Sequence, residues 1–184
     1  MFKSITAGIL ALSALASPVS AMTQTERENH WNIVEALEGA NISVYVNEDA
    51  ICGDPDDRFL GAYIPKARAV VICQEHAKVW NGEAIHFSLE DLDTLRHEAH
   101  HVVQDCLDGR VDGDLVLLFD APQEKAQFRG MIDKRIEPKV RRVYGGAGAS
   151  EHVIQLEIEA FGVAAEVGAA TIAEAVTNVC GYAM

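Results

Sequence analysis

Two histidines and a glutamate within one short stretch are the residues most able to carry chemistry. His97, Glu98 and His101 form the pattern H-E-x-x-H. Residues four positions apart in an α-helix lie on one face, about one turn apart, so both imidazoles can reach a single metal ion. Glu98 follows the first histidine and can accept a proton from a water molecule at that metal. The spacing therefore predicts a helix that supplies two metal ligands and a general base.

The flanking residues favour a helix at this position. Ser88, followed three positions later by Asp91, has the form of a capping box, with the helix beginning at Leu89. Gly109 is a typical stop. Apolar residues recur at spacings of three and four and predict a buried stripe: Leu89, Leu92, Leu95, Ala99, Val102, Val103 and Cys106. The alternative is an amphipathic core helix whose histidines bind no metal.

His100, between the two candidate ligands, is expected to play a different part. It lies about 100° around the helix from His101 and should not share the metal. We expect it either to support a ligand or to lie on the surface.

The first residues have the features of a secretory signal peptide. Lys3 supplies a positive charge, residues 5–16 form an apolar core, and Ala21 completes a small-x-small cleavage pattern. The apolar run is too short to span a bilayer, although a retained N-terminal anchor is the alternative. We therefore expect residues 1–21 to be a signal peptide and residues 22–184 to form a single secreted or periplasmic domain, with no stable membrane insertion after cleavage.

The formal net charge is −13 at neutral pH. Such an acidic chain is repelled by phosphate backbones and by anionic membrane surfaces. We therefore expect no nucleic-acid partner.

An even number of cysteines, four, occurs in this chain with an export signal. Such a count predicts two disulfides, and three pairings are possible. We favour Cys52–Cys73, which would join neighbouring segments, and Cys106–Cys180, which would attach the end of the motif helix to the C-terminus. Reduced core thiols are the alternative. None of the four forms a C-x-x-C pair, which argues against a cysteine zinc site.

A small sheet is expected before the motif helix. Polar residues with helical spacing predict a helix over 26–38, and strict alternation predicts a strand over 42–46. Two further apolar runs, 61–64 and 69–73, flank a turn at residues 65–68. We expect these strands to form a small, mostly antiparallel sheet with residues 69–73 at its edge.

The C-terminal half is expected to be helical, which makes the fold class α+β. A polar stretch predicts a helix over 123–143, bent near Pro138, and residues 144–148 resemble a flexible loop. Further helices are expected over 151–167, capped by Ser150, and over 171–179. The helix expected over 123–143 carries a basic patch, which suits either a solvated helix face or a site that binds a substrate carboxylate. Its residues are Arg129, Lys134, Arg135, Lys139, Arg141 and Arg142.

Catalytic zinc takes three protein ligands and keeps one open position, so a third ligand must come from elsewhere. No histidine occurs at the position that an extended H-E-x-x-H-x-x-G-x-x-H signature would give it. Glu157 and Glu159 lie within the otherwise apolar stretch 151–167. Burying a carboxylate without a partner is costly, and a metal ion would supply that partner.

These two elements together resemble the gluzincin branch of the zincin metallopeptidases. In that branch an H-E-x-x-H helix is followed by a glutamate ligand in a stretch such as E-x-E-A-D. Glu157-Ile158-Glu159-Ala160-Phe161 is similar to that stretch, so the resemblance indicates Glu157 as the third ligand, with Glu159 as the alternative. Phe161 departs from it, because those families often place there an acidic or amide residue that orients a ligand histidine.

The resemblance implies a zincin-like fold and an exported zinc metallopeptidase with one Zn²⁺ per chain and a peptide or protein substrate. His97, His101 and Glu157 would bind the zinc ion, and Glu98 would be the general base. His152 and Tyr144 are candidate donors to the oxyanion. An edge strand, here residues 69–73, would pair with the substrate.

Two other functions remain open on the sequence. The chain could be a catalytically inactive binding protein with the zincin fold, in which the metal is structural. It could also be an exported domain without metal, held together by its disulfides.

Overall fold

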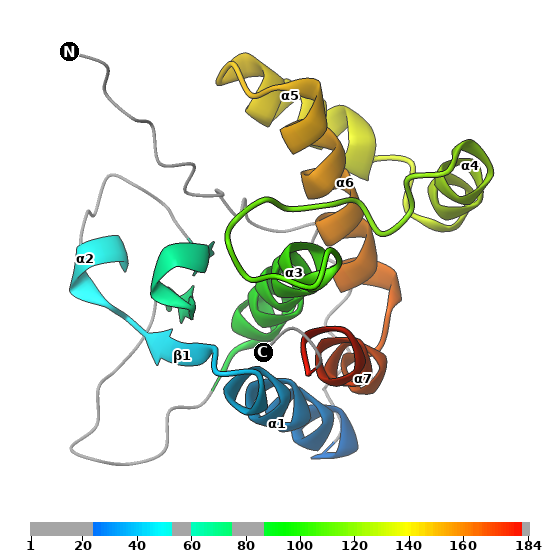
Figure 1. The fold of residues 1–184 in the computed structure, drawn as a ribbon. Helices are drawn as coiled ribbons and strands as arrows, with labels where there is room; N and C mark the ends of the chain where they lie inside the picture. The colour runs from blue at the N-terminus through cyan, green and yellow to red at the C-terminus, as the bar shows by residue number, and fades with distance from the viewer. Residues whose placement is uncertain (1–23, 53–59, 75–86, 182–184) are drawn as a thin grey trace.

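The computed structural model describes residues 24–52, 60–74 and 87–181, and the expected signal peptide lies outside this part of the chain. The described residues form a mostly helical α+β structure with seven α-helices and one three-stranded sheet (Figure 1). The elements are α1 (Gln24–Gly39), β1 (Ser43–Val46), α2 (Asp49–Cys52), β2 (Gly61–Ile64), the 3₁₀ helix η1 (Pro65–Ala67), β3 (Ala69–Ile72), α3 (Leu89–Cys106), α4 (Pro122–Met131), α5 (Ile136–Gly146), α6 (Glu151–Glu166) and α7 (Ala169–Cys180).

The sheet is mixed rather than mostly antiparallel. Its strand order is β1-β3-β2, with β1 parallel and β2 antiparallel to β3. The expectation that residues 69–73 form the edge is therefore wrong, because β3 is the central strand. All four residues of β3 are buried, as a continuous apolar run favours for a strand with neighbours on both sides. The edge strands are β1 and β2.

Helix α3 begins as predicted and lies in the middle of the fold. The Asp91 backbone amide donates to Ser88 Oγ, and the Ser88 amide donates to the Asp91 carboxylate, which completes the capping box. The helix packs against α1, α6, α7, β2 and β3 (Figure 1). With neighbours on several sides, most of its polar side chains are buried, and these must find partners within the protein.

The C-terminal half differs from the prediction at two points. The stretch 123–143 forms two helices, because the chain leaves the helical path at Ile132 and resumes it at Ile136. Pro138 lies in the first turn of α5, where a missing amide donor costs no hydrogen bond, so it does not bend the helix. Residues 144–146 are helical rather than part of a loop, and Tyr144 is buried in α5. The helix predicted from Ser150 forms as α6, with the expected cap.

Both predicted disulfides are present, Cys52–Cys73 and Cys106–Cys180. The first joins the end of α2 to the residue after β3, and the second joins the end of α3 to the end of α7. Two disulfides are typical of a protein that folds in an oxidising compartment. No helix in the described ranges is long and apolar enough to cross a membrane.

The disulfide that closes the longer loop is expected to contribute more to stability. Cys106 and Cys180 are 74 residues apart, whereas Cys52 and Cys73 are 21 apart. From the loop entropy alone, removal of Cys106–Cys180 should cost about 4.5 kcal/mol and removal of Cys52–Cys73 about 3.3 kcal/mol. Chemical denaturation of the Cys106→Ala/Cys180→Ala and Cys52→Ala/Cys73→Ala chains measures both. The reverse ranking would show that local contacts outweigh the loop entropy.

Candidate metal centre

Helices α3 and α6 bring the three predicted ligands together. His97, His101 and Glu157 each offer a ligand atom, and these atoms all lie within 4.8 Å of one another. The two Nε2 atoms are 3.1 Å apart, and the Glu157 carboxylate lies 3.4 Å from His97 Nε2 and 3.6 Å from His101 Nε2. All three residues are at most 2% exposed. A set of two imidazoles and one carboxylate is typical of catalytic zinc.

The polar atoms of this cluster indicate that it is built for a cation. Both carboxylate oxygens of Glu157 are buried and have no hydrogen-bond partner within the described part of the chain. Burial raises the pKa of Glu157 to about 7, against the opposing effects of His101 and of the Tyr144 hydroxyl, which lies near the carboxylate without forming a well-aligned hydrogen bond. Burial lowers the pKa of His97 to about 3 and that of His101 to about 4, which favours the neutral imidazole that binds metals. The residues present therefore fit a zinc ion, which would give the Glu157 charge its missing partner.

Glu98 lies beside the cluster with both carboxylate oxygens buried and without a hydrogen-bond partner in the described residues. Burial and the Glu157 charge raise the pKa of Glu98 well above its usual value. The Tyr63 backbone amide, which lies near the carboxylate without forming a well-aligned hydrogen bond, has a smaller, opposing effect. A raised pKa makes the ionised carboxylate a stronger base, so it takes a proton from water more readily.

Of the two candidate oxyanion donors, only Tyr144 faces the cluster. Its hydroxyl is buried, and burial followed by the charges of Glu157 and Glu98 raises the pKa of Tyr144, so the phenol stays protonated. His152 precedes Glu157 by five residues on α6, which places it about 140° around the helix. Its ring N–H instead donates to the Leu115 carbonyl at 3.0 Å.

Gln104 orients one of the two candidate ligand histidines, a role that was not predicted from the sequence. His101 Nδ1 lies 2.7 Å from Gln104 Oε1, and the Gln104 amide nitrogen donates to Glu159 Oε1 at 2.9 Å. The available signal was its position three residues after His101, on the same helix face. Ligand histidines usually donate their second ring N–H to an acceptor, and Gln104 supplies that acceptor here.

Glu159, the alternative third ligand, lies outside the cluster. Its carboxylate accepts hydrogen bonds from His100 Nε2 at 3.0 Å, from Gln104, and from the Leu118 and Phe119 amides. The structure therefore brings Glu157, and not Glu159, to the two histidines. His100 also lies outside the metal cluster, as predicted, and it is a buried partner of Glu159 rather than a surface residue.

Phe161 is the position at which the sequence departs from the gluzincin pattern. Its ring packs on His97, with the ring centroids 4.3 Å apart. His97 Nδ1 is buried without a hydrogen-bond partner in the described part of the chain. The two histidines are therefore held differently, His101 by a hydrogen bond and His97 by aromatic packing.

Strand β2 approaches α3 at the position of Glu98, and Gly61 makes this close approach possible. A methyl group on Gly61 would lie 2.6 Å from Thr94 Cγ2 and 2.7 Å from the Val71 carbonyl oxygen, with Glu98 Cγ at 3.5 Å. The carbonyl belongs to the central strand and cannot move without disturbing the sheet. Gly61 therefore fixes how near the edge strand lies to the candidate general base.

The Gly61→Ala substitution is expected to lower the free energy of unfolding by about 1–3 kcal/mol, because overpacking forces the strand away from the helix. Thermal and denaturant unfolding measure this change. Gly130→Ala is the matched control, because a methyl group there meets nothing within 4 Å and Gly130 is helical. The control should be neutral or slightly stabilising. Equal stability of the two variants would contradict the role given to Gly61.

The comparisons with known proteins concern the N-terminal two thirds of the chain. A family model described as a domain of unknown function, DUF8637, matches residues 18–135. The matched range includes His97, Glu98 and His101 and ends before Glu157. No curated protein and no solved structure matches the chain. Since the family model covers more than half of its residues, the chain belongs to the DUF8637 family.

Proposed function

We propose that this protein is an exported zinc-dependent metallopeptidase that hydrolyses peptide bonds. One observation carries the proposal: a buried carboxylate, Glu98, has no charged partner and no well-formed hydrogen bond among the described residues, and it lies directly beside a cluster of two histidines and a glutamate. A core helix that served packing alone would leave no such group unsatisfied, because unpaired buried carboxylates are costly.

The residues of the site would divide the work of hydrolysis. His97, His101 and Glu157 would hold the zinc ion, which acts as a Lewis acid toward a water molecule and the scissile carbonyl. Glu98 would accept the proton of the attacking water and deliver it to the nitrogen of the leaving amine. The Tyr144 hydroxyl, protonated and turned toward Glu157 and Glu98, would donate a hydrogen bond to the oxyanion.

The substrate strand would lie along β2. Among the described strands, β2 pairs with β3 alone, so its other edge is the one that an extended peptide can join. Gly61 and Tyr63 belong to this strand, and both lie next to Glu98. A peptide added to β2 would therefore run close to the general base.

A second function is favoured by the burial of the site. The three ligands and Glu98 are all at most 2% exposed, and structural zinc sites are closed in this way. In that case the protein would bind a partner through the same fold, and the metal would serve stability. The experiment that separates the two functions compares the wild-type chain with Glu98→Gln and measures zinc content and peptide hydrolysis in both.

A further inference from the structure

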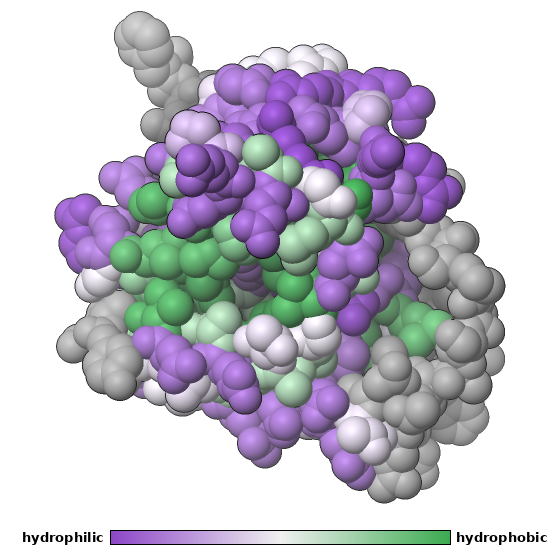
Figure 2. Space-filling model, turned by 90° about the vertical axis from the view of Figure 1, so that its right-hand side faces the viewer, coloured by the Kyte–Doolittle hydropathy of each residue, from purple (hydrophilic) through white to green (hydrophobic). Residues whose placement is uncertain are grey.

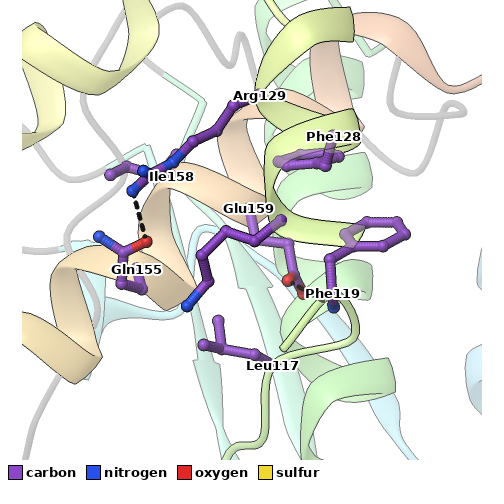
Figure 3. A pocket seen from close by; sticks show the side chains of 8 residues that line it. Leu117, Phe119, Phe128, Arg129, Gln155, Ile158 and Glu159 are labelled. Carbon is purple, nitrogen blue, oxygen red and sulfur yellow. Dashed lines mark hydrogen bonds between the residues drawn. The ribbon is translucent and has the colours of Figure 1, made fainter. Parts of the chain in front are cut away.

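A buried carboxylate outside the metal cluster gathers hydrogen-bond donors from two separate parts of the chain. Glu159 accepts from His100 and Gln104 of α3, at 3.0 and 2.9 Å. It also accepts from the backbone amides of Leu118 and Phe119, at 3.0 and 3.1 Å, in the segment that precedes α4. Figure 3 shows the Glu159 carboxylate beside Phe119 at the wall of a pocket.

The hydrogen bonds of Glu159 determine which ring nitrogen of His101 is free for a metal. A carboxylate only accepts, so the Gln104 side chain must turn its NH₂ group toward Glu159. The same NH₂ group lies 3.3 Å from the Leu156 carbonyl, which is also an acceptor. The Gln104 oxygen must then face His101, and His101 Nδ1 must carry the hydrogen that this oxygen accepts. His101 Nε2 therefore keeps its lone pair, which points toward His97 and Glu157.

The same carboxylate holds the backbone of residues 115–119, which we call the α4-leading segment. The backbone of the α4-leading segment makes two further hydrogen bonds. The Val116 amide donates to the Gln104 carbonyl, and the Leu115 carbonyl accepts from His152. The Val116 and Leu118 side chains are 39% and 38% exposed. On the face turned toward α4 and α7, Figure 2 shows apolar side chains gathered around a hollow. The segment is thus held by its backbone rather than by burial of all its side chains.

We propose that Glu159 is a positioning residue that orients His101 through Gln104 and couples metal binding to the order of the α4-leading segment. The inference uses the metal site of the proposed function but not its peptidase activity. A metal at His101 Nε2 strengthens the Nδ1–H bond to Gln104, and Gln104 shares its acceptor with the Leu118 amide. By reciprocity, whatever loosens the segment from Glu159 weakens metal binding, and metal binding holds the segment more firmly.

The test replaces Glu159 by glutamine in the full-length chain and measures zinc affinity by competition with a chelator. The substitution keeps the shape of the side chain but removes its charge. Whichever way the new amide turns, its NH₂ group meets a donor, either Gln104 and the Leu118 amide at the Oε1 position or the Phe119 amide at the Oε2 position. We expect the affinity to fall about 10–100-fold. In the wild-type chain, zinc should slow hydrogen exchange at the Leu118 and Phe119 amides, and in Glu159→Gln this zinc dependence should disappear.

Asp105→Asn is the matched control. Asp105, like Glu159, is a buried carboxylate, but it lies on α3. It accepts from the Tyr63 hydroxyl at 2.6 Å and from the Gly113 amide at 2.7 Å. It anchors a loop as Glu159 does, but none of these bonds reaches a metal-binding histidine. Its substitution should lower stability and leave zinc affinity within about threefold of wild type. Equal weakening of zinc binding by both substitutions would overturn the positioning role.

A Gln104→Leu variant keeps the proposal falsifiable if Glu159→Gln does not fold. It removes the link between Glu159 and His101 and should weaken zinc binding to a similar extent. In the double variant Glu159→Gln/Gln104→Leu the two losses of zinc affinity should not add, because both substitutions break the same relay of hydrogen bonds from Glu159 through Gln104 to His101. Additive losses, or unchanged zinc affinity in Gln104→Leu, would contradict the relay. Zinc affinity is measured without substrate, so a wild-type chain that binds zinc but cleaves no peptide would contradict only the proposed function.

Discussion

The Glu98→Gln chain is expected to bind about one zinc ion and to hydrolyse peptides at least about 100-fold more slowly than wild type. Glutamine has nearly the volume of glutamate, so the fully buried site should keep its packing. It cannot accept the proton of the attacking water, and general-base catalysis typically contributes 10²–10⁴-fold. The three candidate metal ligands are unchanged by this substitution, so zinc should remain.

Two measurements on the same preparations check this expectation. Zinc content is determined by elemental analysis after dialysis, and hydrolysis is followed by the release of new amino groups from a mixture of unfolded proteins. Glu166→Gln is a suitable control, because Glu166 is exposed on α6 and should be dispensable. A fully active Glu98→Gln chain would overturn the general-base role. A wild-type chain that binds zinc but cleaves nothing would favour the binding protein with a structural metal.

Local sequence was sufficient to predict the helix that carries the motif. The Ser88–Asp91 capping box and the apolar periodicity determine where α3 begins and which side is buried. His97 and His101 then share a face because helix geometry alone fixes their relation. Both disulfides were also predicted, since an even cysteine count implies two bridges and, of the three possible pairings, the one that joins the neighbouring segments around Cys52 and Cys73 was favoured.

Features that depend on long-range packing were predicted less well. The parallel pairing of β1 with β3 joins strands separated by β2 in the chain, and simple alternation does not specify strand order. The unbroken apolar run of β3 was nevertheless a signal for a central strand. Which of the two glutamates, Glu157 or Glu159, lies next to His97 and His101 depends on how α6 is rotated about its axis against α3. The sequence alone left both open, and only the resemblance to gluzincins favoured Glu157. The role of Gln104 depends on the same rotation.

The Glu157→Gln chain is expected to bind zinc at least about 100-fold more weakly than wild type, a loss of about 2.7 kcal/mol. The substitution removes the only anionic group of the three-residue cluster, and replacement of a direct ligand should cost more than the 10–100-fold typical of residues that support ligands. Glu166→Gln again serves as the control on the same helix and should bind zinc like the wild type. Wild-type affinity in Glu157→Gln would show that the cluster is not the zinc site.

Stability distinguishes loss of a ligand from general damage to the fold. Zinc at about 1,000 times its dissociation constant should stabilise the wild-type chain by about 4 kcal/mol, and a chelator should remove this effect. At the same zinc concentration Glu157→Gln, with zinc binding at least about 100-fold weaker, should lose no more than about 1.4 kcal/mol on addition of the chelator. In the absence of metal it should be at least as stable as wild type, because it no longer buries a carboxylate without a partner. Lower stability of the metal-free variant would show instead that the Glu157 charge has a partner within the protein, and the main reason for placing a cation between α3 and α6 would be lost.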